Sequence, residues 1–307
     1  MKTKVAVVGV GYWGKKHVDE YTRLGCEVHV ADANSVTAEE CAAKFSAASS
    51  TLEKILADKE IRFVSVCVPN QLHFEIAKQC LLAGKNVLVE KPLVMRVEEG
   101  EELKKLAESK RLVLNVGHIF RFNNAIEKLR EMVESKSLGQ IYSVSLVWNN
   151  LEPIKPDRDI VFDLAPHPFD IINYVFGRNP DKISCFGRAF RTEDKEEMAL
   201  ITGNLGNTLV SIELSWLTPK KERSVTVVGS EKSVFIDALS QKLSVYDNST
   251  KALEDVEIVQ NNTIQDELKF FLNCESEKNK AGVETGISIV RMLEATVESM
   301  KENSNKR

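Results

Sequence analysis

Near its N-terminus the chain reads Val5-Ala6-Val7-Val8-Gly9-Val10-Gly11-Tyr12-Trp13-Gly14. The apolar, β-branched run predicts a buried parallel strand, and the helical spacing of apolar residues beyond the turn predicts a helix. In such a turn the first glycine permits the tight bend, the second lets the backbone approach a pyrophosphate, and the third lets the helix pack closely on the strand. The stretch therefore predicts a dinucleotide site with the pyrophosphate at the start of the helix.

An acidic residue follows the next predicted strand. Residues 27–31 form that strand and Asp32 ends it, at the distance of about twenty residues where a ribose hydroxyl acceptor is needed. A carboxylate there accepts from two ribose hydroxyls but repels a 2′-phosphate, so NAD is the predicted cofactor and NADP is less favoured. The alternative is that Asp32 only begins a turn and caps the following helix, a task shared with Asn34 or Ser35.

Length and composition limit the class of protein. A chain of 307 residues is long enough for two domains with separate cores. Its net charge of −4 and its lack of a long basic block predict no nucleic-acid or anionic-membrane partner, and no apolar run is long enough for a membrane span. We expect a cytoplasmic protein that binds small molecules and copies of itself. Its six cysteines show no CxxC pair or Cys/His cluster, which predicts free thiols and no metal site.

Strand and helix patterns alternate up to about residue 120, with later strands predicted at 61–68, 86–89 and 112–116. Such alternation predicts an α/β domain over residues 1–122 built on a doubly wound parallel sheet, with ligands outside the carboxyl ends of its strands.

The pattern changes beyond about residue 125, where a helix leads into strands separated by turn signals. These strands are predicted at 141–148, 181–190, 198–204, 209–217, 224–228, 233–237 and 242–246. Residues 123–307 are therefore predicted to form a second α/β domain with a large, open, mainly antiparallel sheet. One face of that sheet is expected to pack on helices and the other to meet another subunit, while the final helix packs back on the first domain.

The tripeptide Glu90-Lys91-Pro92 follows the predicted strand at 86–89, where side chains point into the ligand crevice. A lysine between a cofactor and a neutral substrate loses proton affinity by desolvation, and while charged it donates to the oxygen whose carbon gives up hydride. The tripeptide is short, so an ordinary surface lysine is the alternative.

A second candidate segment is Asp163-Leu164-Ala165-Pro166-His167-Pro168-Phe169-Asp170. The fixed φ of proline predicts a helix that begins near Pro166, with His167 in its first turn. This histidine can take the hydroxyl proton as hydride leaves, and Asp163 or Asp170 can orient it or hold the substrate. The alternative is that Asp163 caps the helix and His167 is a packed ring. The other histidines lack such neighbours and are predicted to be structural or cofactor-lining: His17, His29, His73 and His118.

Taken together, the motifs resemble the glucose–fructose oxidoreductase, inositol dehydrogenase and rhizopine-catabolism (Gfo/Idh/MocA) family. Those that carry the resemblance, in order, are the Gly9-to-Gly14 turn, Pro69-Asn70-Gln71-Leu72-His73, Ala83-Gly84-Lys85, Glu90-Lys91-Pro92, Arg121-Phe122-Asn123, the Asp163-to-Asp170 segment and Val290 to Ala295. The resemblance implies a Rossmann domain and an NAD(P)-dependent dehydrogenase acting on a CH–OH group of a sugar, nucleotide sugar or cyclitol. It also implies homodimers or homotetramers formed through the C-terminal sheet.

The resemblance assigns roles to individual residues. Lys91 and His167 form the acid/base pair, Asp163 assists catalysis or binds sugar, and Arg121 and Asn123 line the sugar site. The predicted cofactor-binding residues are Gly9, Gly11, Tyr12, Trp13, Gly14, Asp32, Pro69, Asn70, His73, Glu90 and Lys91. In the family the Lys91–Pro92 peptide is often cis.

The chain departs from the family pattern within the Asp163-to-His167 stretch. Many members carry a glycine there, whereas this chain has Ala165 followed by Pro166. The turn Gly11-Tyr12-Trp13-Gly14 and the run from Asp163 to His167 resemble the branch that oxidises nucleotide-linked amino sugars, such as UDP-N-acetylglucosamine-type 3-dehydrogenases. Two other hypotheses stay open, namely a regulator that senses dinucleotide and sugar without turnover, and a dihydrodiol- or biliverdin-type reductase of the same fold.

Overall fold

The computed structural model describes residues 2–153, 159–193, 195–273 and 281–304. Two compact units make up the chain, and we call them the Rossmann unit (residues 1–119 and 262–290) and the sheet unit (residues 120–261 and 291–307). The chain thus returns to the Rossmann unit after it has completed most of the sheet unit. The single boundary after residue 122 expected from the sequence does not include this return. No helix in the described part of the chain has the length and apolar character needed to cross a membrane.

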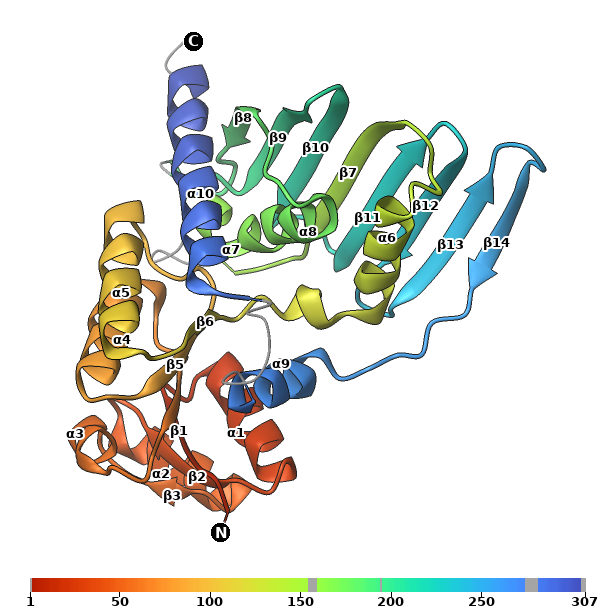
Figure 1. Cartoon of the computed structure of the whole chain (residues 1–307). Helices are drawn as coiled ribbons and strands as arrows, with labels where there is room; N and C mark the ends of the chain where they lie inside the picture. The colour runs from red at the N-terminus through yellow and green to blue at the C-terminus, as the bar shows by residue number, and fades with distance from the viewer. Residues whose placement is uncertain (1, 154–158, 194, 274–280, 305–307) are drawn as a thin grey trace. The chain divides into compact units, whose positions relative to one another are not determined.

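The Rossmann unit is built on six parallel strands. They are β1 (Lys4–Val8), β2 (Glu27–Ala31), β3 (Ala48–Ser49), β4 (Phe63–Val66), β5 (Asn86–Val89) and β6 (Leu114–Val116). The strand order is β3-β2-β1-β4-β5-β6, and every pairing is parallel (Figure 1). The predicted doubly wound sheet is confirmed, and the order reverses between β1 and β4, where sheets of this kind bind ligands.

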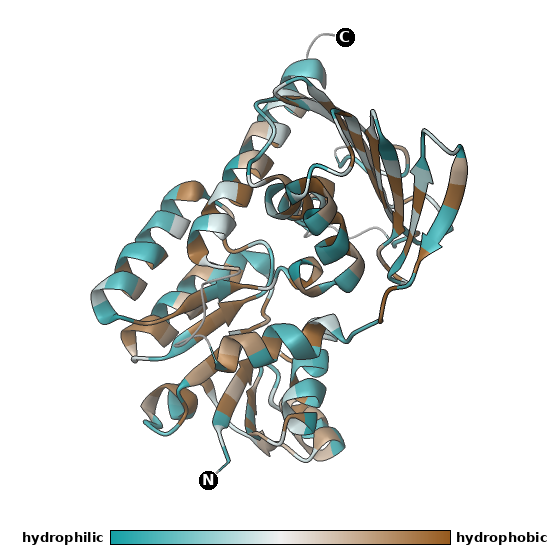
Figure 2. Ribbon diagram, turned by 45° about the vertical axis from the view of Figure 1, so that its right-hand side comes forward, coloured by the Kyte–Doolittle hydropathy of each residue, from teal (hydrophilic) through white to brown (hydrophobic). Residues whose placement is uncertain are grey.

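Helices cover both faces of this sheet. One core contains buried residues of α1 (Tyr12–Arg23), α2 (Ser35–Phe45) and α9 (Thr263–Leu272). The opposite core contains buried residues of α3 (Leu52–Ala57), α4 (His73–Leu82), α5 (Val97–Lys110) and the first turns of α10 (Val283–Ser304). Burial on both faces explains why most of these strands are mainly apolar, as Figure 2 shows, whereas the edge strand β3 is exposed. Helix α10 is continuous, with residues 283–290 in the Rossmann unit and the rest in the sheet unit.

The sheet unit contains β7 (Ile141–Asn149), β8 (Lys182–Arg188), β9 (Met198–Leu205), β10 (Thr208–Ser215), β11 (Glu222–Gly229), β12 (Lys232–Asp237), β13 (Lys242–Asp247) and β14 (Ala252–Val256). Their order is β14-β13-β12-β11-β7-β10-β9-β8. Only the pairing of β7 with β10 is parallel among these described strands. The predicted mainly antiparallel sheet is confirmed.

The two faces of this second sheet differ. Along β7 the side chains of Val144, Leu146 and Trp148 are buried, whereas Ser143 and Ser145 on the other face are only half-buried. The buried face is covered by α6 (Asn124–Glu134), α7 (Ile160–Leu164) and α8 (Pro166–Phe176), as Figure 1 shows. The alternation along the strands is therefore that of a sheet with one packed and one open face.

Candidate functional site

Two glycines of the N-terminal turn are required by the fold itself. Gly9 has a φ of +87°, and a Cβ there would lie 2.7 Å from backbone atoms of Cys67. A Cβ on Gly14 would lie 1.9 Å from the carbonyl oxygen of Gly9. The tight turn and the close contact between α1 and β1 thus leave no room for a side chain at either position.

Gly11 differs because the described part of the protein gives no reason for a glycine there. No atom lies within 4 Å of the position that its Cβ would occupy, and its φ of −67° suits any residue. Gly11 is also the N-cap of α1, a helix with no side-chain cap and no acidic residue in its first turn among the described residues. The space at the Gly11 Cβ position and the absence of a side-chain cap both fit a dinucleotide pyrophosphate approaching the backbone.

Asp32 is held beside the glycine turn. Its Oδ2 accepts a hydrogen bond of 2.9 Å from the Val10 N–H, and its Oδ1 accepts one of 3.0 Å from the Asn34 N–H. The cap of α2 is Asn34, whose side chain accepts from the N–H groups of Val36 and Thr37. Asp32 therefore begins the turn and leaves the capping to Asn34, so its carboxylate lies at the carboxyl end of β2, where ribose recognition requires an acceptor.

Other predicted cofactor residues follow β1, β4 and β5 and thus share the carboxyl edge of the parallel sheet. Tyr12 is 71% exposed and contacts Trp13 edge-on, with ring centroids 5.5 Å apart. Pro69 is exposed, and Asn70 begins a short 3₁₀ helix, η1 (Asn70–Leu72), beyond β4. These positions are compatible with the predicted cofactor contacts, which stay predictions.

The Glu90-Lys91-Pro92 segment follows β5, and its Lys91–Pro92 peptide is cis. Glu90 is buried, with its Oε1 at 3.1 Å from His17 Nε2 and its Oε2 accepting the Lys91 N–H at 3.2 Å. Burial opposes ionisation of Glu90, but hydrogen bonding and charge from His17, with the charge of Lys91, bring its pKa below the ordinary value. Lys91 itself is half-buried.

The prediction that only His167 has acidic neighbours was wrong. His17 contacts Glu90 across 73 residues of sequence, and His29 lies 3.2 Å from Glu27 near the surface. His73 is fully buried between two carbonyl oxygens. The contacts of His17 and His73 depend on tertiary structure, and sequence spacing does not reveal them.

In the sheet unit, α8 begins at Pro166 as predicted, so His167 lies in the first turn. The imidazole is buried, contacts Phe120 edge-on at 5.1 Å between ring centroids, and lies 6.2 Å from Trp148. Asp163 lies in α7 and does not cap α8, so that alternative was wrong; its Oδ2 accepts a 3.2 Å hydrogen bond from Trp216 Nε1. The part of that alternative in which His167 is a packed ring agrees with these two ring contacts.

Arg121 and Asn123 have structural contacts. Arg121 Nε donates to Asp170 at 2.6 Å, and its Nη2 donates to Asn173 at 2.8 Å. Asn123 caps α6 and donates through Nδ2 to the Ala238 carbonyl at 3.0 Å. These bonds explain both residues without a ligand, and their part in sugar binding stays a prediction.

Sequence reasoning missed Arg223. Its guanidinium lies 5.5 Å from the Trp148 ring centroid and donates to the Asn149 carbonyl at 2.8 Å. Burial lowers the pKa of Arg223 to about 10, while the charges of Asp163 and Glu152 oppose that shift. An arginine in the inward register of a strand, followed by Val225 and Val227, was the available signal. No group of three or more His, Cys, Asp or Glu side chains among the described residues is arranged to hold a metal.

A dinucleotide turn on a doubly wound sheet, joined to an open-sheet unit with a buried histidine at a helix start, defines a two-domain NAD-binding oxidoreductase. Residues 3–118 match the model described as oxidoreductase family, NAD-binding Rossmann fold, and residues 126–235 match the GFO/IDH/MocA C-terminal domain. The chain belongs to the Gfo/Idh/MocA family of oxidoreductases.

The chain is similar to several dehydrogenases. UDP-N-acetylglucosamine 3-dehydrogenase of Acidithiobacillus ferrooxidans is 29% identical over 284 residues, which cover 88% of each chain. The scyllo-inositol 2-dehydrogenase (NADP(+)) IolW of Bacillus subtilis is 29% identical over 185 residues, which cover 57% of this chain and 52% of IolW. A solved structure of the Acidithiobacillus enzyme, GnnA, superposes with a TM-score of 0.89 at 25% identity and covers 98% of this chain and 99% of GnnA. Levoglucosan dehydrogenase in complex with NADH shares the fold, with a TM-score of 0.87 at 20% identity over 98% of both chains.

Proposed function

We propose that this protein is an NAD-dependent dehydrogenase that oxidises a carbinol carbon of a nucleotide-linked amino sugar. One observation carries the proposal: the open dinucleotide turn at Gly11 belongs to a chain that matches a UDP-N-acetylglucosamine 3-dehydrogenase over 88% of its length. The lysine after β5 and the histidine at the start of α8 supply the two polar groups that such chemistry needs.

The cofactor-binding part of the proposal assigns each role to groups of this chain. The backbone of Gly9, Gly11 and Gly14 receives the pyrophosphate, and Asp32 accepts from the ribose hydroxyls. When bound, NAD supplies the acceptor for the hydride that leaves the carbinol carbon.

The proton is handled by side chains. His167 takes the hydroxyl proton, and the aromatic rings around it keep water from part of the imidazole. Lys91 donates a hydrogen bond to the same oxygen and stabilises the negative charge that develops there. Asp163 orients the histidine or holds a neighbouring hydroxyl of the sugar.

A panel of substrates tests the proposal. The purified protein is mixed with NAD or NADP and with UDP-N-acetylglucosamine, UDP-glucose, free glucose or inositol, and NAD(P)H formation is followed by absorbance. We expect turnover with NAD and a UDP-amino sugar. Oxidation of free inositol or glucose but not of UDP-sugars would replace the nucleotide-sugar assignment with the broader sugar or cyclitol class. NAD binding without turnover of any compound would favour the regulator.

Variants test the assigned pair. Lys91→Met and His167→Asn should each lower kcat by about 100-fold or more while NAD affinity stays close to that of the parent protein. Lys105→Met and His29→Asn are matched controls, because they remove the same chemical groups at positions outside the proposed site. Parent-like rates in Lys91→Met or His167→Asn would refute the acid/base assignment.

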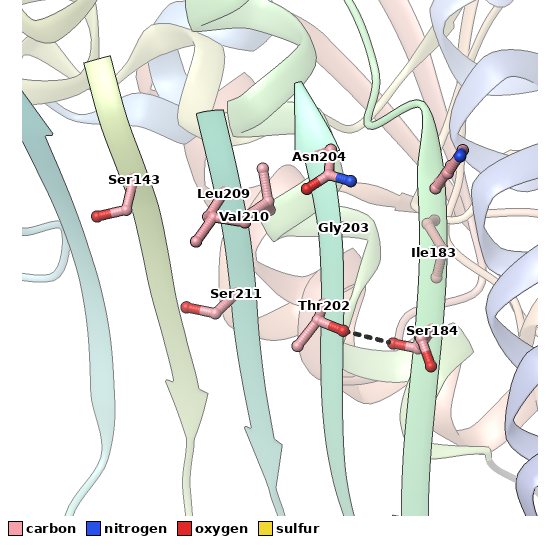
Figure 3. A pocket seen from close by; sticks show the side chains of 10 residues that line it. Ser143, Ile183, Ser184, Thr202, Gly203, Asn204, Leu209, Val210 and Ser211 are labelled. Atoms are coloured by element: carbon pink, nitrogen blue, oxygen red, sulfur yellow. Dashed lines mark hydrogen bonds between the residues drawn. The ribbon is translucent and has the colours of Figure 1, made fainter. Parts of the chain in front are cut away.

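We also propose that the open face of the eight-stranded sheet joins subunits into a homodimer or homotetramer. Exposed apolar side chains occur on this face, among them Phe186, Leu200 and Leu209. A groove of about 460 Å³ lies on the same face. Figure 3 shows residues that line it, and Leu209 pairs with Ser143 on one side and with Asn204 on the other. Large exposed apolar side chains gathered on one face are typical of a subunit interface. The cytoplasmic location stays a prediction.

A further inference from the structure

Two buried histidines flank the segment that carries Lys91. His73 is 0% exposed, with Nδ1 at 2.7 Å from the Pro92 carbonyl oxygen and Nε2 at 3.0 Å from the Val68 carbonyl oxygen. His17 is 1% exposed, with Nε2 at 3.1 Å from a Glu90 oxygen. Each ring thus contacts a residue next to Lys91 in sequence, His73 contacting Pro92 and His17 contacting Glu90.

The partners of His73 define what this ring does. Carbonyl oxygens only accept hydrogen bonds, so a neutral His73 donates to one of them. We take Nδ1 as the donor, because its contact with the Pro92 oxygen is the shorter of the two, at 2.7 Å against 3.0 Å. The ring therefore connects the loop after β4, through Val68, to the loop after β5, through Pro92. A residue without a donor at position 73 would leave the Pro92 carbonyl buried and without this partner.

His17 acts on the other side of Lys91 through Glu90. The lowered pKa of Glu90 keeps this carboxylate charged, so it accepts and His17 donates from Nε2. Nδ1 of His17 is buried and has no hydrogen-bond partner in the described part of the chain, so the proton that this contact requires is the one on Nε2. The second oxygen of Glu90 accepts the Lys91 N–H at 3.2 Å, so the carboxylate orientation set by His17 also sets the Lys91 backbone.

We propose that His73 and His17 are positioning residues for Lys91, His73 through the Pro92 carbonyl and His17 through Glu90. The inference rests on the proposed function, because it takes Lys91 as the donor to the reacting oxygen. Neither ring needs to touch substrate for this role. A displacement of the lysine by about 1 Å is enough to lower turnover by about 100-fold, so the loss of either histidine contact should have a measurable effect on kcat.

Paired amide substitutions separate positioning from plain packing. Asparagine places its amide nitrogen near the position of Nδ1 and glutamine near that of Nε2. His73→Asn therefore keeps the donor to Pro92, and His73→Gln loses it; at position 17 the relation is reversed, because His17→Gln keeps the donor to Glu90. We expect kcat to be at least about tenfold higher in His73→Asn than in His73→Gln, and at least about tenfold higher in His17→Gln than in His17→Asn. KM for NAD should differ less than about threefold within each pair.

A second readout does not depend on the substrate. Reductive methylation of the protein without NAD, followed by mass spectrometry, gives the labelling rate of Lys91 relative to the exposed Lys105. We expect this ratio to change in His73→Gln and His17→Asn and to stay near the parent value in His73→Asn and His17→Gln. Equal ratios in all four variants would overturn the inference even if the dehydrogenase assignment holds. Full turnover in Lys91→Met would instead overturn the proposed function.

The unaltered protein provides a test that requires no variant to fold. Nitrogen-15 NMR of the histidine rings should show the Nδ1–H tautomer or the doubly protonated ring for His73, and a proton on Nε2 for His17. A neutral Nε2–H tautomer at His73, or a neutral Nδ1–H tautomer at His17, would contradict the proposed hydrogen bonds. His29→Asn and His29→Gln serve as controls in the kinetic series, because His29 lies outside this network.

Discussion

Replacing Gly11 with alanine should separate folding from cofactor binding. A Cβ at this position meets no described atom within 4 Å, and the φ of −67° is allowed for alanine. Alanine is a poorer N-cap than glycine but reduces the conformational entropy of the unfolded chain. Because these effects oppose each other, the free energy of unfolding should change by less than about 1 kcal/mol.

The same methyl group lies where the backbone is expected to approach the pyrophosphate. Losing one hydrogen bond from a backbone N–H to a charged oxygen costs about 1.5–3 kcal/mol, which corresponds to an increase in the NAD Kd of about 10- to 150-fold. NAD binding is measured by isothermal titration calorimetry, and stability by urea denaturation of the apoprotein.

Gly14→Ala is the matched comparison. Its Cβ would lie 1.9 Å from the Gly9 carbonyl oxygen, so this variant should lose about 1–3 kcal/mol of stability or more before any cofactor is added. The reasoning is refuted if Gly11→Ala binds NAD as tightly as the parent protein, or if Gly11→Ala is as unstable as Gly14→Ala.

Further predictions concern charge, packing and assembly. Asp32→Asn should raise the NAD Kd about fivefold or more and narrow the preference over NADP, and calorimetric titrations giving an unchanged NAD:NADP ratio would count against ribose recognition by Asp32. Arg121→Met leaves the buried Asp170 without the guanidinium and should cost about 3–5 kcal/mol in urea denaturation, so a loss below about 1 kcal/mol would be inconsistent with a buried pair. Because the folded-state pKa of Glu90 is lowered, this carboxylate stabilises the fold above its ordinary pKa of about 4.3, and the stabilisation is lost as pH falls through the lowered value. In thermal melts between about pH 6 and pH 3, the melting temperature should therefore fall less in Glu90→Gln than in the parent protein. An equal fall in both proteins would refute this prediction. Leu209→Asp should shift the protein to a lower oligomeric state in light scattering, and an unaltered mass would argue against the sheet interface.

The fold was predictable where a local pattern matched the burial of its element. The strands β1, β4, β5 and β6 of the Rossmann unit are buried on both faces and mainly apolar, and the strands of the second sheet alternate, so both sheets were anticipated. β14 was missed because Ala252–Val256 has no buried residue and so lacks the apolar alternation that marks a strand. The five-residue helix α7 is too short for a helical period to show.

The candidate site was predictable only in part. The glycine turn, Asp32, Lys91 and the start of α8 at Pro166 each depend on a few consecutive residues, which a sequence displays directly. The pairing of His17 with Glu90 depends on α1 packing beside the end of β5, across 73 residues. Contacts of that kind are set by tertiary structure and have no local signature.

The central claim is that Lys91 and His167 act on one hydroxyl oxygen. A crystal structure of the protein with NADH and a UDP-amino sugar tests it most directly. The account predicts the Lys91 Nζ and a ring nitrogen of His167 each within about 3.2 Å of the same sugar oxygen. A sugar whose reacting hydroxyl contacts other side chains, with either of these two groups out of hydrogen-bonding reach, would contradict it.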